Sequence, residues 1–233
     1  MVIATAAPGA EAASCVQWPR QTLVWLRRAP CCGADTRTRA IVAWWCERRW
    51  PLIVRRSEAC AGDGDPVALG LPLPPAMGKV RIALTAPRAL VRAAEPLPTL
   101  ASVAAKRGAD ARPSLLRVLH DTLEFGIDAR VFGAWAWQAL TGLGYVTASS
   151  DVDLHVRPRD RAALRIVLAR AAAWDAWLDR RLDLEIALPG DETVAWREWS
   201  SVSGATDRVL VKGSSHVALR TRAELLARLP ERC

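Results

Sequence analysis

The stretch that decides the fold is VFGAWAWQALTGLGYVTASSDVDL, residues 131–154. A strand leads through Gly133 into a short helix, and the next strand carries Asp151 and Asp153. Alternate residues of a strand project from one face, about 7 Å apart, so these two carboxylates lie side by side. They repel each other unless a divalent cation lies between them. The order of strand, glycine turn, helix and Asp-x-Asp strand therefore predicts a site that gathers helix amides and carboxylates around a phosphate-bearing ligand.

A second acidic pair, Asp183 and Glu185, has the same i, i+2 spacing in the predicted strand 181–188. If this strand lies beside the strand at 152–156, a pocket of three or four carboxylates forms. Such a pocket holds one or two Mg²⁺ ions and promotes in-line displacement at phosphorus. Asp-x-Asp alone is also typical of a solvated strand face, so the prediction depends on the surrounding pattern.

The 131–154 stretch resembles the nucleotidyltransferase superfamily typified by DNA polymerase β. More closely, its Trp-Gln, Thr-Gly and Ser-Asp-x-Asp-Leu parts are similar to the phosphoribosyl-dephospho-CoA transferases of malonate decarboxylase, also called malonate decarboxylase holo-acyl-carrier-protein synthases. The likeness spans roughly residues 45–225, because four further segments also match the family: PLIVRR, LGLPLPP with KVRIAL, RLDLEIALPGDETVAWREW and VLVK.

The resemblance implies an Mg²⁺-dependent transferase whose substrate is triphosphoribosyl-dephospho-CoA. In this family, a serine hydroxyl of the apo acyl carrier protein of malonate decarboxylase attacks the α-phosphate, and pyrophosphate leaves. Carried over by position, Asp151 and Asp153 are catalytic and bind Mg²⁺. Asp183 is the third catalytic and metal-binding carboxylate, positioned to activate the serine, and Glu185 is the alternative for that role.

The residues expected to contact the substrate are Gly133, Ala134, Ser150 and Lys212. Gly133 and the amides after it would hold the β- and γ-phosphates. Lys212, one of three lysines, is either a phosphate contact or a solvated residue at a strand end. The chain departs from the family twice, since the usual Gly-Ser turn is Gly133-Ala134 and the usual Asp-Gly-Glu has Leu184 in place of glycine. We expect an active enzyme, because both metal-binding aspartates remain.

The fold class expected is α/β (α+β): a DNA polymerase β-like nucleotidyltransferase domain, preceded by a small α+β domain. The predicted divisions are a disordered leader at 1–15, an N-terminal domain at 16–90 and a catalytic domain at 91–233, with a linker over 86–98. Helices are predicted at 37–49, 99–107, 114–125, 158–178 and 221–229, and another runs from Gly133 to Leu140. Strands are predicted at 51–56, 67–75, 79–84, 128–132, 152–156, 181–188, 209–212 and 216–219.

Composition narrows the function classes. No run of about 18 uncharged apolar residues is present, which excludes a helical membrane span. The net charge of +8 comes almost wholly from arginine, so it indicates either a polyanionic partner or the coding bias of a GC-rich gene. The six cysteines lack C-x-x-C spacing and residues 1–15 lack a secretory signal, which favours a cytoplasmic protein with free thiols.

Two other functions remain open. The chain is alternatively another nucleotidyltransferase, acting on a small molecule or nucleic acid, or a non-catalytic nucleic-acid-binding module. The intact Asp151 and Asp153 disfavour the module and make nucleic acid an unexpected partner. His155 shares the aspartate face. The basic pairs Arg55-Arg56 and Arg157/Arg159 are either solvated or in contact with phosphate or an acidic carrier. The eleven tryptophans are expected mainly to pack the framework around the site.

Overall fold

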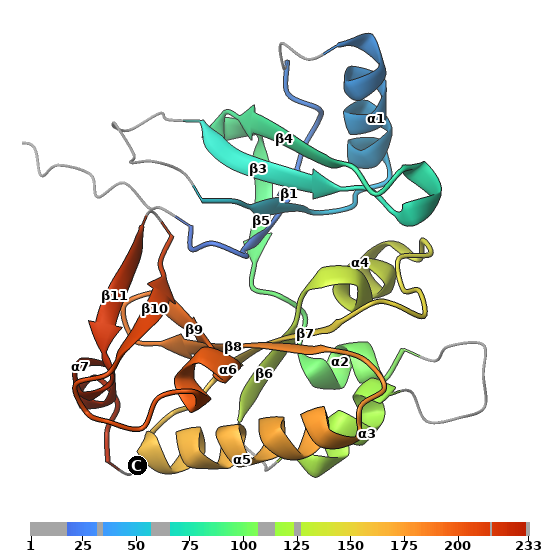
Figure 1. Cartoon of the computed structure of the whole chain (residues 1–233). Coiled ribbons are helices and arrows are strands. Elements are labelled where there is room, and N and C mark those ends of the chain that lie inside the picture. Colours follow the sequence, from blue (N-terminus) through green and yellow to red (C-terminus); the bar gives the residue numbers. More distant parts are fainter. Residues whose placement is uncertain are drawn as a thin grey trace, which may run out of the picture.

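The computed structural model describes residues 18–31, 35–56, 66–106, 115–123, 127–214 and 216–231. It is a mixed α/β structure with two sheets, one in each of two domains (Figure 1). At this level the expected fold class is confirmed. The predicted leader at 1–15 lies outside the described residues, as do residue 107 of the helix predicted at 99–107 and residues 114, 124 and 125 of the helix predicted at 114–125.

The N-terminal domain is an antiparallel sheet of five strands in the order β4-β3-β2-β1-β5. Helix α1 (Thr36–Glu47) begins at Asp35, whose carboxylate accepts a hydrogen bond from the Thr38 N–H and so caps the helix. The fully buried Trp45 donates from its indole to the Pro51 carbonyl, 2.9 Å away. The strands and the two short 3-10 helices are β1 (Leu23–Leu26), β2 (Leu52–Val54), β3 (Val67–Pro72), η1 (Pro75–Met77), β4 (Arg81–Ala86), η2 (Arg88–Leu90) and β5 (Val91–Glu95).

Two strands of this sheet, β1 and β5, were not predicted. The prediction of a linker over 86–98 is wrong, because β5 lies in this range and pairs with β1 from Leu23↔Glu95 to Leu26↔Val91. The sequence of β5, VRAAE, has few residues that favour strands. Its pairing partner lies some 70 residues earlier in the chain, and that contact makes it a strand. The boundary expected at residue 90 therefore cuts through the first sheet.

The C-terminal domain contains a six-stranded sheet in the order β11-β10-β9-β8-β7-β6. Strands β7 and β8 are parallel, and the other neighbours are antiparallel. The predicted elements are present within a few residues of their expected ends, and β9 and α6 are additional. The elements are α2 (Leu100–Ala104), α3 (Leu115–Thr122), β6 (Asp128–Val131), α4 (Gly133–Thr141), β7 (Val152–Arg157), α5 (Arg161–Trp177), β8 (Leu182–Leu188), β9 (Glu192–Ala195), α6 (Trp196–Ser200), β10 (Arg208–Lys212), β11 (Val217–Thr221) and α7 (Arg222–Ala227).

The second sheet lies between the N-terminal domain and the long helix α5 (Figure 1). In β7, Val152, Leu154 and Val156 are buried in the core that includes residues of α5. Asp153 and His155 alternate with them and lie on the other face, which is turned toward the N-terminal domain. Polar side chains on this face are therefore enclosed between the two domains.

Aromatic residues join the two domains. Trp137 of α4 packs into the N-terminal core, with its ring centroid 6.1 Å from that of Trp45. The Tyr145 hydroxyl donates to the carbonyl of Pro72 in β3 over 2.8 Å. Trp196 and Trp199 are buried in the C-terminal core, so these three tryptophans have the packing role expected for them.

Two of the remaining sequence predictions concern membranes and thiols. None of the described helices is long and apolar enough to span a membrane. Among the described residues, Cys31 and Cys46 are free thiols, and the other four cysteines lie outside these residues.

Candidate active site

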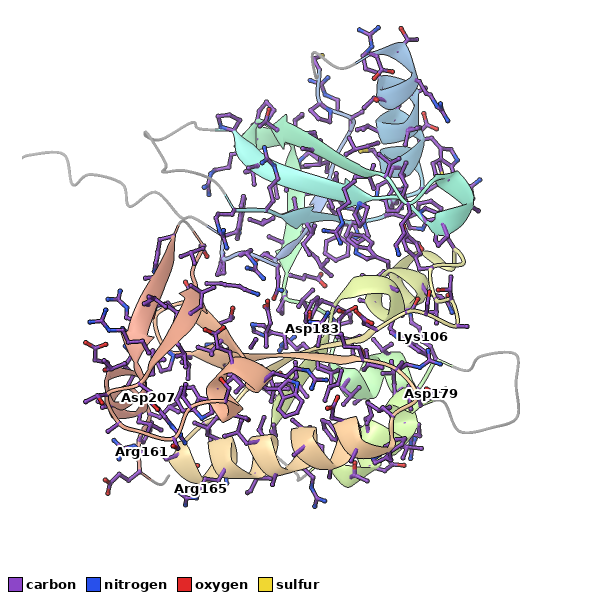
Figure 2. All side chains as sticks on the ribbon, viewed as in Figure 1. Lys106, Arg161, Arg165, Asp179, Asp183 and Asp207 are labelled. Atoms are coloured by element: carbon purple, nitrogen blue, oxygen red, sulfur yellow. The ribbon has the colours of Figure 1, made fainter. Side chains whose placement is uncertain are left out.

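The two acidic strands are neighbours. β7 and β8 pair in parallel with Asp153 opposite Asp183 and His155 opposite Glu185. β7 begins at Val152, so Asp153 lies within the strand and Asp151 lies immediately before it. Figure 2 shows Asp183 on the side of the sheet that faces the N-terminal domain. The condition set by the sequence, that strands 152–156 and 181–188 lie side by side, is therefore met.

The electrostatics of Asp153 show that these carboxylates crowd one another. Burial raises the pKa of Asp153 to about 7, and the charges of Asp183, Asp151 and Glu185 contribute to the increase. Arg81, from β4 of the N-terminal domain, acts in the opposite direction. Sequence reasoning missed Arg81, because it lies in the other domain and no local pattern marks it. The site therefore has a surplus of negative charge that a cation would relieve.

Gly133 allows Asp153 to reach the start of helix α4. Its φ is +63°, and a Cβ at this position would overlap the Asp153 carboxylate. The Phe132 N–H donates to the Asp153 carbonyl over 3.1 Å, and the Trp135 indole donates to the Asp151 carbonyl over 3.1 Å. The first N–H groups of a helix have no intrahelical acceptor and favour negative charge. The Asp153 carboxylate therefore lies beside the first backbone N–H groups of α4.

Glu185 differs from Asp183, although the two residues are only one position apart on the same strand face. Its side chain is buried and accepts hydrogen bonds from Arg20 Nη2 at 3.0 and 3.1 Å and from Gln21 Nε2 at 3.1 Å. Lys212 Nζ lies 3.5 Å away. These partners neutralise Glu185 and hold it against the N-terminal segment. Asp183, half-buried opposite Asp153, is the better placed third carboxylate.

The remaining expected substrate contacts have structural partners. Ala134 is partly buried against the N-terminal core. Ser150 stabilises the loop before Asp151, because its hydroxyl accepts from the Thr147 N–H at 2.9 Å. Lys212 forms the ion pair with Glu185 described above. Gly133, the residue expected to bind phosphate through its backbone, lies directly against the Asp153 carboxylate.

The donor chemistry suits Mg²⁺ shared with a ligand. In the described part of the chain, no group of three or more His, Cys, Asp or Glu side chains is arranged to hold a metal ion. Protein Mg²⁺ sites commonly use one or two carboxylates together with substrate phosphates and water. Asp151, Asp153 and Asp183 supply hard oxygen donors, and burial together with their mutual repulsion raises the pKa of Asp153. These residues fit an ion that arrives with a phosphate substrate, and not a metal centre made by protein alone.

Comparison with known families decides the relationship. The model of the phosphoribosyl-dephospho-CoA transferase MdcG C-terminal domain matches residues 99–223, and that of the N-terminal domain matches residues 19–96. The chain belongs to the phosphoribosyl-dephospho-CoA transferase family. The two matches meet just after β5, in agreement with the pairing of β5 in the first sheet.

Individual relatives support this assignment. The phosphoribosyl-dephospho-CoA transferase of Xanthomonas euvesicatoria pv. vesicatoria is 38% identical over 215 residues, which cover 88% of this chain and 95% of the relative. That of Bradyrhizobium diazoefficiens is 36% identical, with 83% of each chain covered. That of Xanthomonas campestris pv. campestris is 36% identical, over 92% of this chain and 98% of the relative. No solved structure is significantly similar to the chain. The predicted family and enzyme class, phosphoribosyl-dephospho-CoA transferase, are confirmed.

Proposed function

We propose that this phosphoribosyl-dephospho-CoA transferase uses triphosphoribosyl-dephospho-CoA and modifies a serine of the apo acyl carrier protein of malonate decarboxylase. Attachment of the prosthetic group to that carrier is the activity of its family. The observation that supports the site is the parallel register of Asp153 with Asp183, beside Gly133 at the start of α4. This arrangement of acidic side chains and helix amides supports the binding of a triphosphate.

In the proposed reaction, the carrier serine oxygen forms a bond to the α-phosphorus. The bond between the α-phosphorus and the oxygen that bridges to the β-phosphorus breaks, and pyrophosphate leaves with that electron pair. Asp183 accepts the serine proton, because it is the acidic residue of β8 that is not neutralised by Arg20 and Lys212. The amides at the start of α4 bind the β- and γ-phosphates, aided by the positive end of the helix dipole.

We infer that Asp151 and Asp153 hold Mg²⁺ together with the triphosphate, with Asp183 nearby as the third carboxylate. When bound, Mg²⁺ neutralises phosphate charge and stabilises the charge that develops on the leaving pyrophosphate. The role of the protein is to keep these carboxylates close despite their repulsion. Their position at the helix start and the fixed pairing of β7 with β8 support this role.

We also infer a DNA polymerase β-like nucleotidyltransferase fold for the C-terminal domain. The support is the succession of β6, a glycine turn, α4 and the acidic strand β7, followed by the parallel strand β8 with a further aspartate. The N-terminal domain covers the polar face of this sheet and supplies Arg20, Gln21 and Arg81 to its surroundings.

The direct test measures the mass of the carrier. The enzyme is incubated with Mg²⁺, triphosphoribosyl-dephospho-CoA and apo carrier, and we expect the carrier to gain the mass of one phosphoribosyl-dephospho-CoA group. Asp151→Ala should lower the transfer rate about 1,000-fold, equivalent to about 4 kcal/mol of transition-state stabilisation. Asp179→Asn is the matched control, because Asp179 is exposed and pairs only with the neighbouring Arg180 among the described residues.

Two results would contradict the proposal: no mass gain with the wild-type enzyme, or an undiminished gain with Asp151→Ala. Salt-dependent binding to DNA without any transfer would favour the nucleic-acid-binding alternative.

A further inference from the structure

A cavity of about 60 Å³ lies between the N-terminal segment and the polar face of the second sheet. Residues 19–21 form one wall, and the ends of β7, β8 and β10 and the start of β9 form the others. The Arg20 N–H donates to the Ser214 hydroxyl over 3.1 Å, which fixes the segment across the cavity.

The cavity brings together three cations from distant parts of the chain: Arg20, Arg157 and Lys212. Arg157 is exposed, and it takes part in none of the ion pairs found among the described residues. Of the two lining carboxylates, Glu192 is already paired with Arg228 at 2.5 Å and contacts His216 Nε2 at 2.9 Å. Both of these partners lie outside the cavity lining. Arg20 and Lys212 are paired with the neighbouring Glu185, and Asp191 is the other carboxylate that opposes the cations. Three cations therefore face two carboxylates, and this net positive charge favours an anion.

The cavity continues the face that carries the catalytic carboxylates. His155 and Arg157 follow Asp153 on the same side of β7. With alternate residues about 7 Å apart, they lie roughly 7 and 13 Å from Asp153 along the strand. An acidic region and a basic region thus occupy one face, separated by about the length of two sugar rings.

We propose that the cavity binds the diphosphate of the dephospho-CoA part of the substrate. This inference rests on the proposed function. The substrate carries two groups of phosphates, the triphosphate and the diphosphate, with two ribose rings between them. With the triphosphate at Asp153 and Gly133, the diphosphate reaches the basic cavity. The cavity has room for a few water molecules, which a phosphoryl group would replace. Arg157 lies at the exposed side, where the pantetheine arm continues into solvent.

Arginine is well suited to this task, because its planar guanidinium donates two parallel hydrogen bonds to phosphate oxygens. Glu185 holds Arg20 in place, because both of its carboxylate oxygens accept hydrogen bonds from Arg20 Nη2. Glu185 is therefore a positioning residue. It orients Arg20 toward the cavity and is itself too enclosed to take part in proton transfer.

The test uses dephospho-CoA as the probe, because this molecule carries the diphosphate and lacks the triphosphate. Its dissociation constant is measured by calorimetry on the full-length enzyme without Mg²⁺. Arg157→Gln should weaken binding about tenfold, as expected for the loss of a charge-assisted hydrogen bond. Asp191→Asn should strengthen binding a few-fold, because it removes the opposing charge. Arg159→Gln is the matched control, since Arg159 is exposed, adjoins the same strand and is absent from the cavity lining.

A second measurement separates this inference from the proposed function. In the transfer assay, Arg157→Gln should raise KM for triphosphoribosyl-dephospho-CoA and leave kcat nearly unchanged, because uniform binding is lost. Binding of pyrophosphate with Mg²⁺ should be unaffected by Arg157→Gln and lost in Asp153→Asn. The inference is overturned if wild type does not bind dephospho-CoA or if Arg157→Gln binds it within twofold of wild type. Failure of wild type to modify the carrier would instead overturn the proposed function.

Discussion

Two acidic regions of the second sheet show what burial does to a carboxylate with and without cationic partners. Burial, together with the charges of the neighbouring acids Asp183 and Asp151, raises the pKa of Asp153 to about 7. Burial also acts to raise the pKa of Glu192, but hydrogen bonds from His216 and Arg228 outweigh it and leave the pKa below its usual value. Glu192 is a structural ion-pair centre. Asp153 retains an unsatisfied charge, which is the condition for binding a cationic ligand.

The largest expected effect on stability comes from removing the charge of Glu192. Glu192→Gln leaves Arg228, Arg220 and His216 without their shared carboxylate. We expect the free energy of unfolding to fall by about 2 kcal/mol, less than for a fully enclosed pair, because these partners are partly exposed. Urea unfolding measures this change.

The control for this prediction is Glu231→Gln. The Glu231 side chain is 86% exposed and pairs with Arg161 at the surface. Its loss should change the free energy of unfolding by no more than about 0.5 kcal/mol. Equal effects of the two substitutions would show that the ion pairs of Glu192 contribute no more than a surface pair.

The next effect has the opposite sign. Asp153→Asn should inactivate the enzyme and yet raise its free energy of unfolding by about 1 kcal/mol at pH 8 in Mg²⁺-free buffer. The folded-state pKa of Asp153 is raised to about 7 from an ordinary value of 3.8, so folding becomes less favourable as the pH rises between these values. The advantage of the variant should therefore disappear at pH 4.

If Asp153 binds Mg²⁺, adding the ion should reverse the difference in stability between wild type and Asp153→Asn. Mg²⁺ should stabilise the wild type in thermal unfolding and leave Asp153→Asn unchanged, because a ligand stabilises only the state that binds it. Equal stabilisation of both proteins would remove Asp153 from the metal site.

The smallest effect is the pH dependence of Glu192. Its pKa is lowered from 4.5 in the folded state, so its contribution to stability is present above pH 4.5 and is lost as the pH falls through the folded-state value. The stability difference between wild type and Glu192→Gln should therefore shrink below pH 4.5. Urea unfolding at a series of pH values measures it, and a difference that grows on acidification would contradict the assignment.

The sequence was sufficient to predict the acidic centre, because its signals are local. The i, i+2 spacing in β7 and β8 predicts which side chains share a face, and the glycine before α4 indicates a close approach. The structure adds that the approaching group is the Asp153 carboxylate. Strand β5 was missed, because its strand conformation depends on pairing with β1 and not on its own residues.

The choice between Asp183 and Glu185 also needed the structure. Both acids have the same spacing and the same strand, so no local pattern separates them. The difference arises from Arg20 and Gln21, which precede Glu185 by 165 and 164 residues and belong to the other domain. Arg81 was missed for the same reason. Periodicity indicates the face on which a side chain lies, but its partner across a domain interface depends on tertiary packing.

The contact between Arg20 and Glu185 also sets an order of events during biosynthesis. All five strands of the first sheet lie within residues 23–95, so this domain has its complete set of strands early in translation. Its N-terminal segment docks only after β8 has been made, because the carboxylate it binds lies 165 residues later. Domains commonly fold as units while synthesis continues, and contacts between distant residues form late. The basic cavity is therefore assembled after both sheets exist, and a nascent chain that ends before Glu185 has no complete substrate site.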